Sequence, residues 1–203
     1  MSRLGHIAFM KIAIHNSDVV PTLTRALFPT LLHVRENFLP DPMLASLAAA
    51  AIDKADVEDD ALKRAVIDFA LGALRTENVN LERYDAIELS EMWFNAYDAG
   101  EHHWDHTHAN HILSGVLYLN DGCFTIFGDP RPAASVLTLH YKEGKSGHVR
   151  SYVHKGARNM IVLFPSWLPH RVATTASPRK TIAFNLMLRG AFGGDRSREQ
   201  ITL

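Results

Sequence analysis

The chain has 203 residues, 47% of them hydrophobic, and a formal net charge of −1, which fits one globular domain with a full core. Its 21 basic and 22 acidic residues nearly balance, so the basic surplus typical of nucleic-acid-binding proteins is absent. No apolar run approaches the roughly 20 residues of a membrane-spanning helix. The single cysteine, Cys123, excludes an internal disulfide and suits a reducing compartment. We therefore expect a cytoplasmic protein that binds neither nucleic acid nor membrane.

The first 80 residues are expected to support the fold. Residues 1–24 are interpreted as a leader or an edge segment, and residues 25–80 as mainly helical support. Asp41-Pro42 is typical of a helix start, with Asp as the cap and Pro at the first helical position, and predicts a helix from residue 42 to about residue 53. A second helix is predicted from near Asp59. Its apolar residues follow the spacing of one buried face: Leu62, Val66, Phe69 and Ala73.

After residue 79 the sequence changes to short segments rich in β-branched and aromatic residues, separated by turn-forming residues. The predicted strands are 87–97, a short piece holding His106 and His108, 112–120, 123–127, 135–141, 149–154, 160–164, 170–174 and 180–188. Two helices followed by eight or nine strands predict an α+β, mainly β domain, with the helices buttressing a β-sandwich or barrel. We interpret the chain as one domain with a β core at 81–190 and a charged tail at 191–203.

A histidine cluster is the main candidate for a metal site, because five of the twelve histidines lie between His102 and His111. In a strand, residues i and i+2 face the same side at a spacing of about 6.5 Å, so His106 and His108 can converge on one metal ion. His170, after the rigid segment 165–169, is the predicted third ligand. Three protein ligands with open positions are typical of a catalytic metal site.

A second pair of ligands lies in the same stretch. His103 and Asp105 form an HxD sequence, which is two-thirds of the 2-His-1-carboxylate triad of non-haem iron sites. In a regular strand this pair faces the side opposite to His106 and His108, so the two pairs exclude each other at one metal. We favour the HxH pair and leave the HxD pair open.

Taken in order, these motifs resemble the Fe(II)- and 2-oxoglutarate-dependent oxygenases, and most closely a bacterial and phage-type subgroup with an HxH…H motif. The matching pieces are 27–30, 93–97, 106–108, 113–118, 127–131, 163–172 and 179–185. The resemblance implies a double-stranded β-helix (jelly-roll, cupin-like) core and Fe(II) held by three histidines. It also implies a dioxygenase that hydroxylates a C–H bond of a small-molecule or carrier-bound substrate; a homodimeric assembly stays open.

The resemblance extends to a cosubstrate site at Arg179 and Thr181. In the superfamily a basic residue and a hydroxyl at this spacing after the last ligand hold the distal carboxylate of 2-oxoglutarate, and a guanidinium pairs well with a carboxylate. Alternate residues from Arg179 to Asn185 share one strand face and are expected to point into the barrel. Tyr118 and Asn95 are further candidates for cosubstrate contacts, with core packing and satisfaction of a buried backbone group as their respective alternatives.

Two features of the sequence leave two alternative functions open. Most members of the superfamily have a carboxylate where this chain has His108. In addition, Gly100, His106 and His108 match the opening of the cupin motif, although the expected Glu does not follow. The alternatives are a three-histidine cupin dioxygenase or isomerase that does not use 2-oxoglutarate, and a non-catalytic jelly-roll module that binds a ligand.

Five aromatic residues are candidates for the lining of a pocket and would equally suit a small β core: Trp93, Trp104, Trp167, Phe124 and Phe127.

Overall fold

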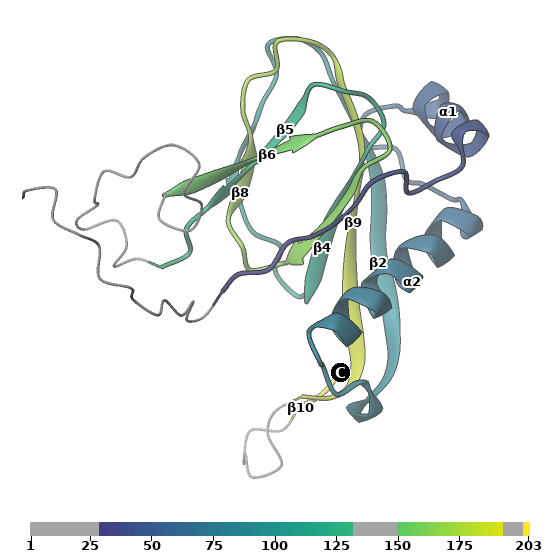
Figure 1. Cartoon of the computed structure of the whole chain (residues 1–203), viewed down its shortest axis with the longest axis vertical. Helices are drawn as coiled ribbons and strands as arrows, with labels where there is room; N and C mark the ends of the chain where they lie inside the picture. The colour runs from purple at the N-terminus through teal and green to yellow at the C-terminus, as the bar shows by residue number, and fades with distance from the viewer. Residues whose placement is uncertain (1–28, 132–149, 193–200) are drawn as a thin grey trace, which may run out of the picture.

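The computed structural model describes residues 29–131, 150–192 and 201–203 (Figure 1). Within these ranges the chain forms two α-helices, one short 3-10 helix and ten strands in antiparallel pairs. The predicted leader at 1–24 and the predicted strand at 135–141 lie outside the described residues. No helix in the described ranges is both long and apolar enough to cross a membrane.

The elements follow one another in the order β1 (His33–Arg35), α1 (Asp41–Ala50), α2 (Asp60–Thr76), η1 (Leu81–Arg83), β2 (Tyr84–Tyr97), β3 (His103–His106), β4 (Leu113–Tyr118), β5 (Cys123–Gly128), β6 (Ser151–Gly156), β7 (Ile161–Pro165), β8 (His170–Val172), β9 (Arg179–Phe192) and β10 (Ile201–Thr202). The strands predicted in the described ranges from residue 87 onward are present, except that the short strand predicted to hold both His106 and His108 is β3, which ends at His106. Both long strands, β2 and β9, extend beyond their predicted bounds, and the last residues of the chain pair with β9 as β10.

The two helices test the predicted helix starts. Helix α2 begins as predicted, because the side chain of Asp59 accepts a hydrogen bond from the Leu62 amide at 2.9 Å. Helix α1 differs: its cap is Pro40, whose carbonyl accepts the first helical bond from the Leu44 amide at 3.1 Å. Pro42 then lies in the first turn, where no amide hydrogen is needed. The helix ends at Ala50 because the following chain leaves it to pair with the outer edge of β2.

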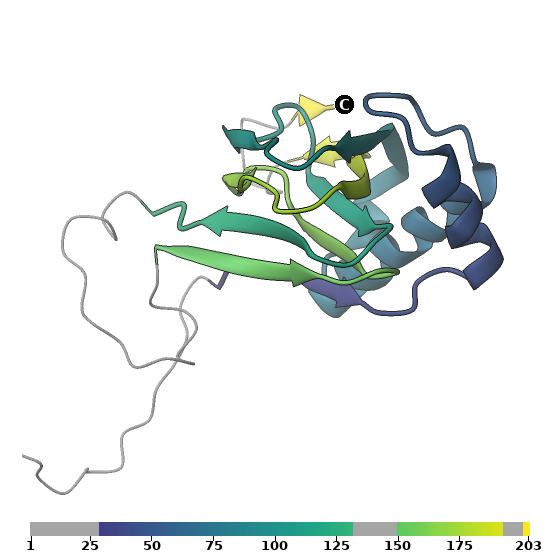
Figure 2. The ribbon, with the colours of Figure 1, turned by 90° about the horizontal axis from the view of Figure 1, so that it is seen from above.

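The strands form two sheets that face each other, in the predicted jelly-roll arrangement. The larger sheet has the order β1-β7-β4-β9-β10, with β2 paired to β9, and the smaller has the order β3-β8-β5-β6. Helices α1 and α2 lie along the larger sheet, on the side away from the smaller one (Figure 1), and Figure 2 shows them from above, gathered at one side of the strands. The predicted mainly β core with supporting helices is confirmed.

Strand β4 separates two hydrophobic cores. Leu113 and Leu117 face the helices and join the larger core, whereas Val116 and Tyr118 face the smaller sheet and join the second core. All six residues of β4 are buried, as expected for a strand covered on both faces. The alternate residues of β4 and its neighbours that face the smaller sheet are therefore available to build a site between the sheets.

Candidate active site

The register of β2, β9 and β4 arranges side chains in rows on the inner face of the larger sheet. The rows are Tyr97–Arg179, Asn95–Thr181–Tyr118, Trp93–Ala183–Val116 and Glu91–Asn185–Ser114. Rows with hydrogen-bonding groups therefore lie on either side of an apolar row. The prediction that alternate residues from Arg179 to Asn185 share an inward face is confirmed.

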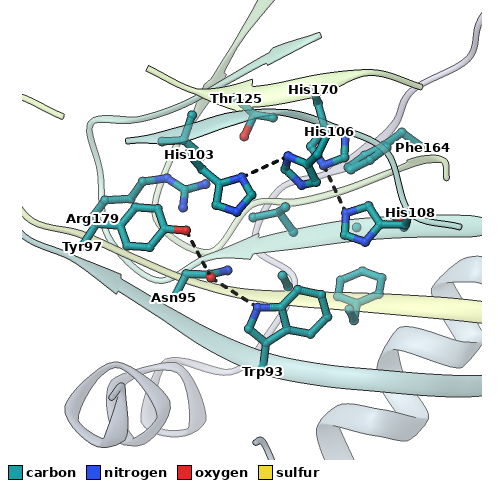
Figure 3. Close-up of a pocket in the computed structure, with 16 residues that line it drawn as sticks. Trp93, Asn95, Tyr97, His103, His106, His108, Thr125, Phe164, His170 and Arg179 are labelled. Atoms are coloured by element: carbon teal, nitrogen blue, oxygen red, sulfur yellow. Dashed lines mark hydrogen bonds between the residues drawn. The ribbon is translucent and has the colours of Figure 1, made fainter. Parts of the chain in front are cut away.

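A cavity lies between the sheets and opens beside β2. An inner part of about 80 Å³ is bounded by Trp93, Asn95, Tyr97 and Arg179 on the larger sheet and by the histidines across from them (Figure 3). An outer part of about 380 Å³ shares residues of the β2 wall with it and adds polar residues of both charges: Asp53, Lys54, Glu101 and His102. The inner part can hold a small reactive group, and the outer part offers room for a larger molecule.

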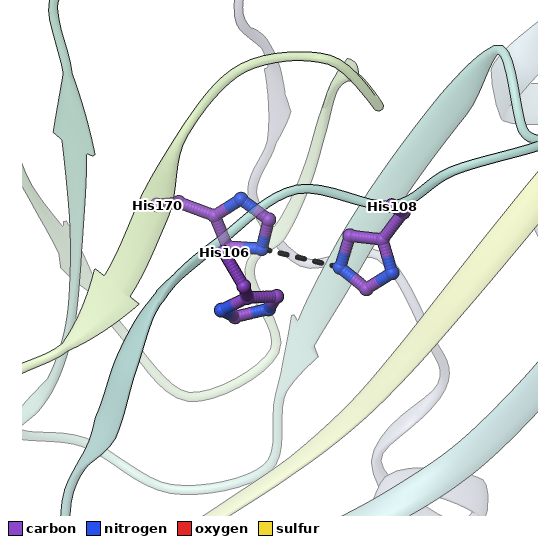
Figure 4. A group of neighbouring side chains, drawn as sticks. All are labelled: His106, His108 and His170. Atoms are coloured by element: carbon purple, nitrogen blue, oxygen red, sulfur yellow. Dashed lines mark hydrogen bonds between the residues drawn. The ribbon is translucent and has the colours of Figure 1, made fainter.

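Three imidazoles meet at one end of the inner cavity (Figure 4). One ring nitrogen from each of His106, His108 and His170 lies within 4.8 Å of the others. His106 and His170 are cross-strand neighbours of β3 and β8, with ring centroids 4.2 Å apart. The Nε2 atoms of His108 and His170 are 3.3 Å apart. The predicted convergence of the three rings is therefore confirmed.

Backbone carbonyls orient two of these rings. His170 donates from Nδ1 to the Leu168 carbonyl at 2.9 Å, so its Nε2 carries a lone pair directed at the other imidazoles. The Nδ1 of His106 lies 2.8 Å from the Trp104 carbonyl. His108 is held at its backbone, because its amide donates to the Ser166 carbonyl at 3.0 Å.

The route by which the rings converge differs from the predicted one. Strand β3 ends at His106, and His108 lies in the loop beyond it, so the two are not i and i+2 of one strand. The prediction that His103 faces the opposite side was also wrong, since its Nδ1 is 3.0 Å from that of His106. A register shift between His103 and His106 interrupts the pairing of β3 with β8 and breaks the alternation of sides. Asp105 turns outward to the half-exposed Arg171, at 3.3 Å.

Burial keeps two of the rings neutral. Desolvation, helped by neighbouring imidazoles, lowers the pKa of His108 and of His170 from 6.5 to about 4. At neutral pH both rings therefore offer a lone pair without first losing a proton. Neutral imidazoles are suitable ligands for iron and other transition metals, so the cluster fits a divalent metal ion.

The other end of the inner cavity carries a buried positive charge. Arg179 is 3% exposed, donates from Nη1 to the Thr181 hydroxyl at 3.0 Å and lies over the Tyr97 ring. Its Nε has no hydrogen-bond partner, and no carboxylate forms an ion pair with it among the residues that the structure describes. A buried charge is costly unless it is paired, so this end of the cavity favours an anionic ligand.

The remaining predicted site residues divide between the cavity wall and its surroundings. Asn95 lines the cavity, where its Oδ1 accepts from Trp93 Nε1 at 3.2 Å and from the Tyr97 hydroxyl at 3.5 Å. Tyr118 is fully buried beside Thr125, with 2.8 Å between their hydroxyls, and burial raises its pKa to about 12. Thr125 reaches the cavity, whereas Tyr118 is not part of its lining.

Sequence reasoning missed Tyr97, Thr125 and Glu91. The signal for Tyr97 and Glu91 was present in the spacing, since both share the parity of Asn95. Of the five aromatic candidates for the lining, Trp93 alone lines either part of the cavity. Trp104 and Trp167 are 78% and 55% exposed, Phe124 is exposed, and Phe127 belongs to the core between the sheets.

The fold and the site define a jelly-roll protein with a histidine cluster inside its barrel. A prolyl-4-hydroxylase from Pseudomonas putida is similar, with 20% identity, a TM-score of 0.54, and coverage of 83% of this chain and 89% of that one. Apo HygX from Streptomyces hygroscopicus has 11% identity, a TM-score of 0.53 and coverage of 78% and 82%. HygX with nickel, 2-oxoglutarate and hygromycin B bound has 12% identity, a TM-score of 0.50 and coverage of 78% and 83%. At these identities the likeness concerns the fold alone.

The family follows from the sequence of the barrel itself. Residues 91–185 match the family described as "Putative 2OG-Fe(II) oxygenase", a stretch that includes the histidine cluster and Arg179. No protein with a curated description matches the chain. Residues 91–185 thus carry the sequence of a 2OG-Fe(II) oxygenase domain, the family that the motifs resemble, and the protein is a 2-oxoglutarate-dependent non-haem iron oxygenase. Its predicted cofactor and cosubstrate, Fe(II) and 2-oxoglutarate, are those of this family.

Proposed function

We propose that the protein is a dioxygenase that uses Fe(II) and 2-oxoglutarate to hydroxylate a C–H bond of a substrate bound in the outer cavity. One observation supports this above the others. A single small cavity is lined both by three converging imidazoles and by a buried guanidinium that has no carboxylate partner among the described residues. A metal ion and an elongated dicarboxylate would satisfy both ends at once.

In this proposal His106, His108 and His170 hold the iron on one side and leave its other positions open. The neutral state of His108 and His170 at physiological pH leaves each of these two rings with a lone pair, and the apolar residues Val116 and Phe164 limit access of water. When bound, iron and 2-oxoglutarate supply the oxidative chemistry, in which O2 delivers one oxygen atom to succinate and one to the substrate C–H bond, with release of CO2.

Arg179 and Thr181 bind the distal carboxylate of 2-oxoglutarate. The guanidinium offers a fork of donors, and the Thr181 hydroxyl, which now accepts from Arg179, adds a further hydrogen bond. Tyr97 stacks against the guanidinium and holds it in place. We assign Tyr118 a supporting role through the hydroxyl of Thr125, and Asn95 a role at the boundary between cosubstrate and substrate.

The substrate is expected to be a small or carrier-bound molecule that enters through the outer cavity. Trp93 offers this molecule a flat apolar surface, and Asp53, Lys54 and Glu101 offer charges of both signs. A substrate with a planar or apolar part next to polar groups of either charge fits such a wall.

The test determines which products receive the two oxygen atoms of O2. Protein loaded anaerobically with Fe(II) is supplied with 2-oxoglutarate, candidate substrates and isotopically labelled O2. We expect one labelled oxygen atom in succinate and one in a product whose mass has increased by one oxygen. Labelled succinate with an oxidised but unhydroxylated product would overturn hydroxylation alone. No succinate from fully iron-loaded protein, with any candidate or without one, would overturn the proposed function.

A further inference from the structure

A continuous chain of hydrogen-bonded side chains lies behind His108. Asn185, 1% exposed, accepts at Oδ1 from the Ser114 hydroxyl at 2.7 Å and donates from Nδ2 to Glu91 Oε2 at 2.8 Å. The same Nδ2 lies 3.2 Å from Nδ1 of His108. Ser114 also contacts the hydroxyl of Ser166 at 2.8 Å, and the carbonyl of Ser166 accepts from the His108 amide. This series of hydrogen bonds therefore holds His108 at both its ring and its backbone.

A bulge in β2 brings Glu91 into this chain. Leu89 and Glu91 would share a face in a regular strand, but the pairing with β9 shifts register between them. Leu89, opposite Leu186, packs against the core on the helix side, whereas Glu91, opposite Asn185, faces the histidines. The irregularity therefore turns a carboxylate toward the site instead of the helices.

The donors and acceptors of this chain have one consistent direction. A carboxylate only accepts, so Glu91 fixes Nδ2 of Asn185 on the side of His108. The second hydrogen of Nδ2 then points at Nδ1 of His108, which must accept, and the proton of this neutral ring is on Nε2. Nε2 donates in turn to the lone pair of His170 at 3.3 Å. In this arrangement a proton occupies the space between two nitrogens of the cluster.

A metal ion on Nε2 of His108 requires the other tautomer, with the proton on Nδ1. A half-turn of the Asn185 amide meets this requirement: Oδ1 accepts from Nδ1 of His108, and Nδ2 donates to the Ser114 hydroxyl. Ser114 can then donate to Ser166. Glu91 then loses its bond from Asn185, and its side chain, which is 56% exposed and lies 4.0 Å from Nε2 of His111, can be solvated instead.

We propose that Asn185 is a positioning residue with two settings, one that keeps His108 in its metal-free tautomer and one that supports it as a metal ligand. This inference rests on the proposed role of His108 as an iron ligand. Loss of the hydrogen-bond partner of a metal-bound histidine typically lowers metal affinity by about 10- to 100-fold. Asn185→Leu, which offers neither setting, should therefore weaken binding by that factor.

The test measures Co(II) affinity by visible absorption and the tautomer of His108 by 15N NMR of the ring. A carboxylate at 185 only accepts and favours the metal-ready tautomer, so Asp should strengthen binding. Asn185→Asp is made in the Glu91→Gln background, which avoids two adjacent carboxylates, with Glu91→Gln alone as its reference. We expect roughly tenfold tighter binding and the proton on Nδ1 in the double variant. Glu88→Gln, on the same strand but paired with Arg189, should bind Co(II) like the wild type.

The outcomes separate this inference from the proposed function. If the wild type binds Co(II), His108→Ala does not, and the substitutions at 185 change neither affinity nor tautomer, then this inference alone falls. If the wild type does not bind Co(II), both fall. Should Asn185→Leu fail to fold, as judged by thermal melting of the metal-free protein, the double variant and its reference still decide the matter.

Discussion

The two ends of the inner cavity are built in different ways. At the arginine end, Arg179 and Thr181 stand opposite Tyr97 and Asn95 in the long, regular pairing of β9 with β2. At the histidine end, the three rings come from places where strands stop: His106 closes β3, His108 follows in a loop and His170 opens β8. The regular ladder fixes the position of a charge, whereas the strand ends let three rings turn toward one point.

The two ends also differ in charge. The arginine end holds a buried cation without a carboxylate partner in the described part of the chain, and the histidine end holds at least two neutral rings. One end therefore favours an anion and the other a metal cation. A single dicarboxylate that coordinates the metal at one end and pairs with Arg179 at the other connects them.

The largest effect is expected at the histidine end. His170→Ala removes one of three ligands and should abolish succinate formation. It should weaken Fe(II) binding by more than about 100-fold, because removing a ligand costs more than removing a residue that hydrogen-bonds to a ligand. Metal content after anaerobic loading and gel filtration measures the first effect. His33→Ala, on β1 outside the cluster, is the control. Full retention of iron in the His170 variant would show that the metal is held elsewhere.

At the arginine end the change should spare the metal. Arg179→Gln removes the buried charge and should cost 2-oxoglutarate binding about 2 to 4 kcal/mol, or roughly 30- to 1000-fold in its dissociation constant, with Fe(II) affinity unchanged. Calorimetric titration of the Fe(II)-loaded protein under anaerobic conditions measures this constant. The control is Arg171→Gln, which removes a half-exposed arginine paired with Asp105. Equal affinities for the two variants would place the carboxylate site elsewhere.

A moderate effect is expected from the lowered histidine pKa values. In the unfolded chain His108 and His170 take up protons near pH 6.5, but in the metal-free fold they resist protonation until about pH 4. The unfolded state therefore binds more protons between these values, and stability falls as the pH is lowered through that window. Urea unfolding measures the free energy of unfolding at pH 7 and pH 5. The decrease in this free energy between the two pH values should be smaller for His170→Gln than for the wild type. Equal decreases in the two proteins would mean that burial of His170 does not contribute to the pH dependence of stability.

The smallest effect is expected at Asp105. Because this carboxylate faces outward and pairs with Arg171 on the surface, Asp105→Asn should change Fe(II) affinity less than about threefold. The same metal-content assay measures it beside His170→Ala. A loss as large as that of His170→Ala would make the HxD pair the true source of ligands.

The contrast between the two ends also explains what the sequence could predict. Side-chain parity placed Arg179, Thr181 and Asn185 on the inward face, because the ladder between β2 and β9 is continuous there. The same rule misplaced His103, because β3 is four residues long and shifts register within that length. Parity is informative only where pairing is regular, and no residue type in 103–106 signals the shift.

Exposure was the other limit of sequence reasoning. Trp104 and Trp167 are aromatic residues of the kind that line pockets, yet both project into solvent. Trp104 lies on β3, at the edge of the smaller sheet, and Trp167 lies in the turn between β7 and β8. Whether such a residue is covered depends on which elements pack above it, and local sequence does not carry that information.

The most direct test of the account is a crystal structure of the protein prepared anaerobically with Fe(II) and 2-oxoglutarate, with anomalous scattering collected at the iron edge. We predict one iron peak within bonding distance of ring nitrogens of His106, His108 and His170, and the distal carboxylate of 2-oxoglutarate on Arg179. An iron peak on His103 and Asp105, or none within the barrel, would contradict it.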